Sequence, residues 1–189
     1  MVISFLMVIL AGGLWFKNEV ENSELEELSY EVVSDMEEVF DEYIANKDNE
    51  NYERIDKIEH KGTTYIGVLT IPSLNNMSLG VIDKFSMDNL KVSVCRYSGG
   101  IGQDNMVIAG HNYKYSFGQL YKLNIGAKAY FKTMDGTLYE YRCTKIEELL
   151  PTDVEKMKNG DWDMTLYTCT FGAQKRLTLR FELENKMKI

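Results

Sequence analysis

The spacing of apolar residues divides the chain into three regions of different character. Residues 2–16 are continuously uncharged, residues 23–46 repeat apolar side chains at steps of three and four, and short alternating segments follow from about residue 62. Steps of three and four are the period of an amphipathic helix, whereas alternation is the period of a half-buried strand. The pattern therefore predicts a helical N-terminal part followed by a β-rich domain.

The first region has the character of a membrane anchor. It ends with Trp15 and Phe16 before Lys17, an arrangement typical of a membrane–water boundary. Its residues would span about 22 Å as a helix, short of the roughly 30 Å hydrocarbon core. We expect a signal anchor over residues 1–17, either truncated or continued upstream. A buried core helix is the alternative, and the acidic segment that follows directly favours the anchor.

The second region is predicted to be an amphipathic helix over residues 23–46. Ser23 is expected to cap its N-terminus, with Glu26 completing a capping box. One stripe of the helix is apolar and consists of Leu25, Leu28, Val32, Met36, Val39 and Tyr43. A stalk, a coiled-coil contact and packing on the domain all fit, and packing is favoured because the stripe needs a partner. A polar linker is expected at residues 46–51.

The third region is predicted to contain short strands joined by turns. Asp135-Gly136 indicates a hairpin turn, and residues 152–158 are typical of a short helix. The expected strands are Tyr65–Ile71, Leu79–Ile82, Met106–Ala109, Ala127–Lys132, Leu138–Cys143, Thr165–Cys169 and Arg176–Glu182. Such a series is typical of a closed or nearly closed β-barrel.

Charge and cysteine usage narrow the possible functions. Residues 18–60 hold 16 acidic and 3 basic side chains, whereas the rest of the chain holds 13 and 18, which indicates two modules. No basic stripe interleaved with aromatic residues is present, so a nucleic-acid-binding domain is not expected. The three cysteines lack the spacing of a metal site and leave at least one free thiol. A disulfide between Cys95 and Cys143 stays open.

Three residues at strand ends supply the parts for acyl transfer through a thioester. Cys169 ends one predicted strand, His111 follows another after Gly110, and Arg176 begins the strand that pairs with that of Cys169. A hairpin places Cys169 and Arg176 side by side. An inert cysteine and a turn-capping histidine are the alternatives, and Arg180, on the same strand face as Arg176, is the alternative arginine.

Four further segments matter in the order in which they occur along the chain. They are Ile66–Pro72, Val107–His111 with Phe117–Leu120, Leu150–Val154, and Thr165–Cys169 with Lys175–Arg176. Together they resemble the sortases, membrane-anchored cysteine transpeptidases of Gram-positive bacteria, and the resemblance covers about residues 62–184. The resemblance leaves the subclass open, because the His111 segment and the Leu150–Val154 segment favour different branches.

The resemblance implies an eight-stranded β-barrel over residues 62–189, preceded by an acidic helical region over residues 18–61 and the anchor. It implies that Cys169 is the nucleophile, His111 the general acid/base and Arg176 the oxyanion-stabilising or substrate-positioning group. Thr168, Asn112 and Arg180 are further candidates for substrate contact. No metal or cofactor is expected.

The implied substrate is a surface protein with a Leu-Pro-X-Thr-Gly-like sorting signal, and the implied acceptor is an amine of a cell-wall precursor. The domain is then expected outside the cell, held by a single membrane pass. Two alternatives are a pilin-polymerising sortase with a lysine acceptor and a membrane-tethered β-domain that binds extracellular ligands without catalysis. The second alternative predicts an unreactive Cys169 that lies far from His111.

Overall fold

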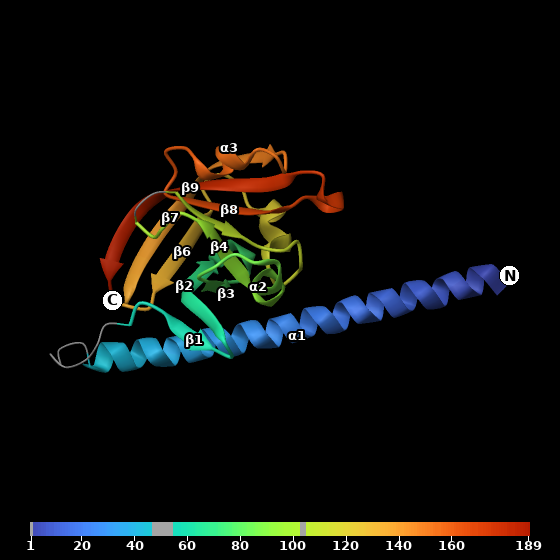
Figure 1. Cartoon of the computed structure of the whole chain (residues 1–189), viewed down its shortest axis with the longest axis horizontal. Coiled ribbons are helices and arrows are strands. Elements are labelled where there is room, and N and C mark those ends of the chain that lie inside the picture. The colour runs from blue at the N-terminus through green and yellow to red at the C-terminus, as the bar shows by residue number, and fades with distance from the viewer. Residues whose placement is uncertain (1, 47–54, 103–104) are drawn as a thin grey trace.

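A long helix and one closed sheet make up the part of the chain that the computed structural model describes, residues 2–46, 55–102 and 105–189 (Figure 1). The helices are α1 (Val2–Asn46), α2 (Met87–Val92) and α3 (Val154–Lys158), with 3₁₀ turns η1 (Pro72–Leu74), η2 (Phe117–Lys122) and η3 (Phe171–Ala173). The strands are β1 (Ile58–His60), β2 (Thr63–Ile71), β3 (Met77–Ile82), β4 (Val94–Ser98), β5 (Met106–Ala109), β6 (Lys128–Thr133), β7 (Thr137–Leu149), β8 (Met164–Cys169) and β9 (Arg176–Lys188).

Across the described residues the strands form one nine-stranded sheet in the order β1-β2-β3-β4-β5-β8-β9-β7-β6. An additional pairing between β2 and β6 closes eight of these strands into a ring and leaves β1 attached outside it. The prediction of a mainly β domain with short helices is confirmed. β1, β4 and α2 were not predicted, and β7 and β9 extend well beyond the expected segments.

The ring is filled by the apolar residues that alternate along its strands. Leu69, Ile108, Phe131, Leu166 and Phe181 are completely buried and belong to one continuous cluster. Each such side chain contributes about 1.5–3 kcal/mol when it leaves water. This cluster fixes which strand residues face inward, and therefore also which ones are left on the outer face.

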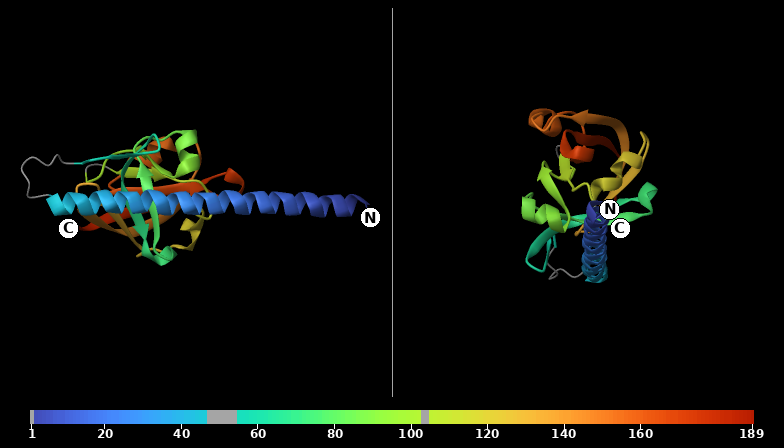
Figure 2. Two further views of the ribbon diagram at one scale, coloured as in Figure 1. Left: turned by 90° about the horizontal axis from the view of Figure 1, so that it is seen from below. Right: turned by 90° about the vertical axis from the view of Figure 1, so that its right-hand side faces the viewer.

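Helix α1 packs on the outside of β2 and β3, as its apolar stripe predicted. Val32 and Met36 are buried there, and Gly80 of β3 allows the close approach, because a Cβ atom at Gly80 would lie 2.7 Å from Val32 Cγ1. Glu37 adds an ion pair with Lys132 of β6. In Figures 1 and 2 the C-terminal half of α1 lies along the sheet, whereas its N-terminal half projects beyond the domain.

The predicted start of this helix was wrong. α1 runs without interruption from Val2, so Ser23 is an interior residue whose hydroxyl donates to the carbonyl of Val20 at 2.8 Å. No proline separates residues 2–16 from the acidic segment, and good helix formers follow the Gly12-Gly13 pair. The helix therefore continues across the point where a capping box was expected.

The segment before the ring is more ordered than a linker. Residues 58–60 form β1, and the His60 Nδ1 atom lies 2.7 Å from an Asp35 carboxylate oxygen of α1. The sequence predicts a helical region and linker over residues 18–61. The half-buried His60 therefore contacts α1, whereas Glu59 and Lys61 on either side of it are exposed.

Two predictions on the N-terminal part are not decided by the fold. Within the residues that the structure describes, no helix has both the length and the apolar character needed to cross a membrane. The anchor predicted over residues 1–17 therefore stays a prediction. The polar linker predicted at residues 46–51 lies, apart from Asn46, outside the described residues.

Candidate active site

Three neighbouring strands carry the predicted chemical groups to one end of the sheet. Cys169 and Arg176 are direct register partners on β8 and β9, so their side chains share one face. On the other side of β8, Ala109 of the parallel strand β5 pairs with Tyr167. His111 lies two residues beyond Ala109, as Cys169 lies two residues beyond Tyr167. The three predicted residues therefore lie at the same level, at the ends of three neighbouring strands, and Cys169 belongs to the middle strand.

The backbone around His111 is held by local hydrogen bonds. The Gly110 amide donates to the Tyr167 carbonyl at 3.1 Å, which ties this segment to β8. The Phe117 amide donates to the His111 carbonyl at 3.0 Å. A Cβ atom at Gly110 would lie 2.5 Å from the Phe117 ring, so glycine is required for the ring to pack there. The Gly-His sequence and the later Phe117 thus form one structural unit.

The electrostatic surroundings of His111 favour its neutral form. Its ring is half-buried and stacks on Tyr113 with a centroid distance of 4.6 Å. Burial lowers the pKa of His111, and the cation of Lys91 lowers it further. Lys91 belongs to α2 and is paired with Asp88 at 2.8 Å. Lys91 was not among the predicted site residues, because nothing local in the sequence predicts that α2 lies beside the His111 loop.

The turn between Cys169 and Arg176 is closed by its own hydrogen bonds. The Thr170 amide donates to the Lys175 carbonyl at 3.0 Å, and the Lys175 amide donates to the Thr170 hydroxyl at 3.1 Å. Arg176 Nη1 donates to the carbonyls of Ala173 and Lys175 at 3.3 and 3.2 Å. These bonds direct the half-buried guanidinium along the turn that follows Cys169.

Cys169 is the accessible thiol of the described domain. It is half-buried, whereas Cys95 on β4 and Cys143 on β7 are fully buried. All three are free, so the disulfide left open for Cys95 and Cys143 is absent. Burial raises the pKa of Cys95 to about 12 and that of Cys143 to about 11, which keeps both as inert thiols.

A cluster of aromatic and apolar side chains adjoins Cys169 on the same face. Tyr167 is two residues earlier on β8 and meets Tyr97 of β4 edge-to-face at 5.7 Å. Met157 of α3 packs into this cluster together with Val107 and Leu149. Burial raises the pKa of the Tyr167 phenol, which therefore stays neutral. The alternation of β8 could have indicated Tyr167, since residues two apart share a face.

Arg180 lies in a different environment from the one predicted. It is 1% exposed, and all its bonds are internal. Nη1 donates to the carbonyl of Met157 at 2.8 Å and to the hydroxyl of Thr165 at 3.0 Å, Nη2 donates to the carbonyl of Lys156 at 2.6 Å, and Nε lies 3.0 Å from a Glu147 oxygen. This burial removes Arg180 from direct contact with a substrate.

The two other residues predicted to contact the substrate, Asn112 and Thr168, lie in different environments. Asn112 is exposed beside His111. Thr168 is buried and alternates with Cys169, so it faces the same way as Leu166, toward the core. Its hydroxyl has no hydrogen-bond partner among the described residues. Thr168 therefore faces away from the surface that carries Cys169, whereas Asn112 keeps its place among the candidates.

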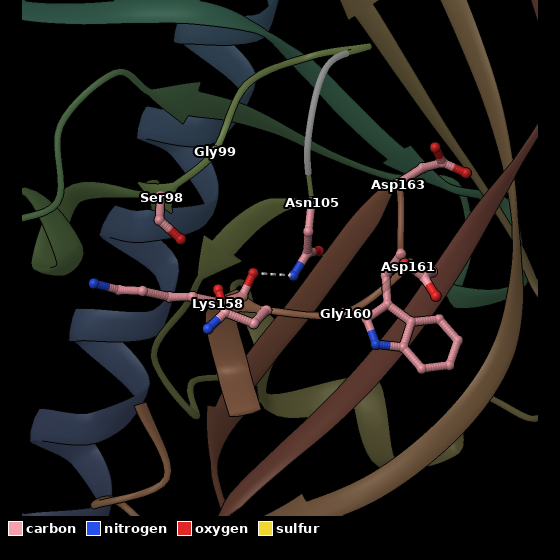
Figure 3. Close-up of a pocket in the computed structure, with 9 residues that line it drawn as sticks. Ser98, Gly99, Asn105, Lys158, Gly160, Asp161 and Asp163 are labelled. Atoms are coloured by element: carbon pink, nitrogen blue, oxygen red, sulfur yellow. Dashed lines mark hydrogen bonds between the residues drawn. The ribbon is translucent and has the colours of Figure 1, made fainter. Parts of the chain in front are cut away.

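A cavity of about 560 Å³ lies at the opposite end of β8 (Figure 3). Asn105 projects into it and donates to the Lys158 carbonyl at 3.1 Å, the bond drawn in Figure 3. Its lining comes from the loop after β4 and from the segment that joins α3 to β8, namely Ser98, Gly99, Asn105 and residues 158–163. The cavity is therefore separated from Cys169 by the length of β8.

Comparison with known proteins relates the chain to one family. The family model of the sortase domain matches residues 69–184. Sortase A of Listeria monocytogenes is 28% identical with a TM-score of 0.61, over 66% of this chain and 90% of that protein. A sortase D5 transpeptidase of Clostridium perfringens shares the fold at 20% identity and TM-score 0.64, over 84% and 99% of the two chains.

Sortase C-3 of Streptococcus pneumoniae also shares the fold, at 22% identity and a TM-score of 0.58, over 91% of each chain. None of the curated proteins matches the chain. The structural neighbours include sortases of several classes, so they leave the subclass open. The match of the family model covers more than half of the chain. The chain belongs to the sortase family of cysteine transpeptidases.

Proposed function

We propose that this chain cleaves a Leu-Pro-X-Thr-Gly-like sorting signal through a thioester on Cys169 and transfers the protein to a cell-wall amine. The observation that carries the proposal is that His111, Cys169 and Arg176 lie at the same level of the sheet. Cys169 and Arg176 are register partners on β8 and β9, and His111 follows the end of the neighbouring strand β5. A thiol flanked by an imidazole and a guanidinium on one open face suits acyl transfer. The exposed Phe171, directly after the nucleophile strand, offers the substrate an apolar contact.

The chemistry begins with the transfer of the Cys169 proton to neutral His111. The thiolate attacks the scissile carbonyl carbon, and the carbonyl electron pair moves onto oxygen. Arg176 stabilises this oxyanion with a fixed positive charge. When the oxyanion collapses, the C–N bond breaks and His111 returns its proton to the leaving amine, which leaves an acyl group on the Cys169 sulfur.

The second half regenerates the enzyme. An acceptor amine attacks the thioester carbonyl, Arg176 again stabilises the oxyanion, and the new amide forms as the Cys169 thiolate departs. His111 takes the surplus proton of the amine and returns it to the thiolate. The lowered pKa of His111 leaves its imidazole neutral near pH 7 and therefore able to accept this proton.

We also propose that residues 1–17 attach the protein to the membrane, so that the domain acts at the cell surface. The uncharged stretch before Lys17 and the projection of the N-terminal half of α1 away from the domain support this attachment. Fractionation of cells that produce the chain with and without residues 2–16 tests it. Recovery of both forms in the soluble fraction would contradict the attachment.

Mass spectrometry of the purified chain with sorting peptides and triglycine tests the central proposal. We expect an acyl adduct on Cys169 and a triglycine-ligated product. Cys169→Ala should abolish both, and Cys143→Ala, which changes a buried thiol, should keep both. If Cys169 resisted peptides and a small thiol reagent alike, the non-catalytic binding domain would replace the transpeptidase.

A further inference from the structure

We propose that Arg180 is a positioning residue for the substrate, because it fixes α3 as one wall of the surface on which the peptide reaches Cys169. The inference rests on the proposed function and assigns a role in the same site to a residue that does not touch the substrate. It is carried by the contacts of α3, by the side chains that α3 covers, and by the chemistry of the guanidinium.

Buried side chains hold α3 in place. α3 has five residues, too few for a helix to be stable without tertiary contacts. Its last carbonyls have no partner within the helix and need donors from elsewhere. Arg180 donates to the carbonyls of Lys156 and Met157, and Asn105 donates to those of Met157 and Lys158. Two buried side chains therefore set the position of α3.

α3 covers aromatic side chains on the face that carries Cys169. Met157 is 5% exposed and belongs to the apolar cluster against which Tyr97 and Tyr167 pack, and Lys158 places its ammonium 5.4 Å from the centre of the Tyr97 ring. Tyr167 lies one step before Cys169 on the same strand face. A peptide that follows this face toward Cys169 therefore passes the Tyr97–Tyr167 pair at the edge of α3. Displacement of α3 would change the surface that the peptide meets.

The contacts of residue 180 require the shape of an arginine side chain. The guanidinium presents its donors in a fixed planar fork, and here that fork reaches two α3 carbonyls, Thr165 and Glu147 at once. A lysine at this position would keep the positive charge next to Glu147 but would lose the fork. Arg180→Lys therefore removes the positioning function while retaining the charge.

The test compares steady-state transpeptidation by the full chain and by Arg180→Lys. We expect the KM for the sorting peptide to rise about 10-fold, while kcat stays within about 3-fold. The 10-fold change corresponds to the loss of one or two hydrogen bonds from a charged group. The rate of Cys169 alkylation by iodoacetamide should be unchanged, because the substitution leaves Cys169, His111 and Arg176 in place. Arg142→Lys, at an exposed pair with Glu184, is the matched control and should change none of these values.

A second variant keeps the test decisive if Arg180→Lys does not fold. Asn105→Ala removes the other donor to the α3 carbonyls and should also raise KM without changing the alkylation rate. An unchanged KM in the folded variants, or a fall in kcat and alkylation together, would overturn the positioning role. If the wild-type chain forms no acyl adduct with any peptide, the proposed function fails first, which distinguishes the two failures.

Discussion

The two ends of the β8–β9 hairpin present the same residue type under opposite conditions. At one end Arg176 is the register partner of Cys169, and at the other Arg180 is the register partner of Thr165. Both arginines project from the same face of β9, four residues apart. Arg176 is half-buried and bonded to the carbonyls of its own turn, whereas Arg180 is buried and bonded to α3, Thr165 and Glu147. The chain therefore places one arginine beside Cys169 at an open edge and the other inside its framework.

The difference arises from what covers the strands. α3 lies over the Thr165 end, and its last carbonyls accept hydrogen bonds from Arg180. The guanidinium is therefore shielded from water and bonded to buried partners. No helix of the described residues covers the Cys169 end in the same way, since η3 continues from it as an exposed turn. A charge at an open edge remains available for a developing oxyanion, whereas a buried charge is already neutralised by its partners.

The largest expected effect is on activity at the open end. Arg176→Met should reduce kcat/KM for transpeptidation by about 10²–10³-fold, the cost of removing one oxyanion-stabilising donor group. The free energy of unfolding should change by no more than about 0.5 kcal/mol, because the side chain is near the surface. Peptide kinetics and urea unfolding of the same preparation measure both quantities. A large loss of stability with retained activity would reverse the roles assigned to the two arginines.

The next effect is on stability at the closed end. Arg180→Met should lower the free energy of unfolding by about 3 kcal/mol, because it removes the donors that Arg180 supplies to Glu147, Thr165 and the α3 carbonyls. This value is at the lower end of the stability losses expected when a buried ion pair is broken, since the Glu147 side chain is 22% exposed. Urea denaturation measures the change, and Lys175→Met, which breaks the exposed pair with Glu148, is the matched control. Equal stability of Arg180→Met and wild type would contradict the framework role.

The pH dependence of stability gives an independent check on the ion pair between Arg180 and Glu147. Burial opposes the charge of Glu147, but hydrogen bonds from Lys145 and Arg180 outweigh it and lower the pKa of this carboxyl. A carboxyl with a lowered pKa contributes stability above its ordinary pKa and loses it as the pH falls through the folded-state value. The stability difference between wild type and Arg180→Met should therefore shrink on acidification. A difference that grows at low pH would point to another cause.

The strands around the open end could be predicted because their signals are local. The alternation of residues 165–169, the short turn and the start of a strand at Arg176 lie within a few residues of each other. The predicted strands β5 and β8 agree with the structure to within one residue. Local alternation therefore sufficed to bring Cys169 and Arg176 together, and the strand end before His111 gave the third position.

The closed end could not be predicted because its partners are distant in sequence. Arg180 is exposed or buried depending on α3, Glu147 and Thr165, and strand alternation alone does not reveal that α3 returns over this face. The same limitation hid Lys91, since its position near His111 depends on how α2 packs. The capping box at Ser23 failed for the opposite reason, because a valid local motif was overridden by a helix that continues upstream.

A substitution in α1 tests whether this helix affects the stability of the domain or the activity at the Cys169 end. Met36→Ala removes a buried side chain from the contact between α1 and the sheet and should lower the free energy of unfolding by about 2–3 kcal/mol. kcat/KM should stay within about 2-fold, because α1 packs on β2 and β3, away from the Cys169 face. Denaturation and peptide kinetics measure the two values, and the exposed Glu38→Gln serves as the control. A matching loss of activity would show that α1 contributes to the site.

The smallest expected effect concerns the charge environment of the open end. Lys91→Met removes a cation that disfavours the imidazolium form, so the pKa of His111 should rise, yet burial should still hold it below its ordinary value. Asp88→Asn removes the carboxylate paired with Lys91 and should lower the pKa of His111 instead. Titration of the His111 ring protons by NMR measures both shifts, and both should weaken in high salt because Lys91 is exposed. Shifts of the same sign in the two variants would indicate that α2 acts on His111 through its packing, and the open end would then depend on the framework as much as the closed end does.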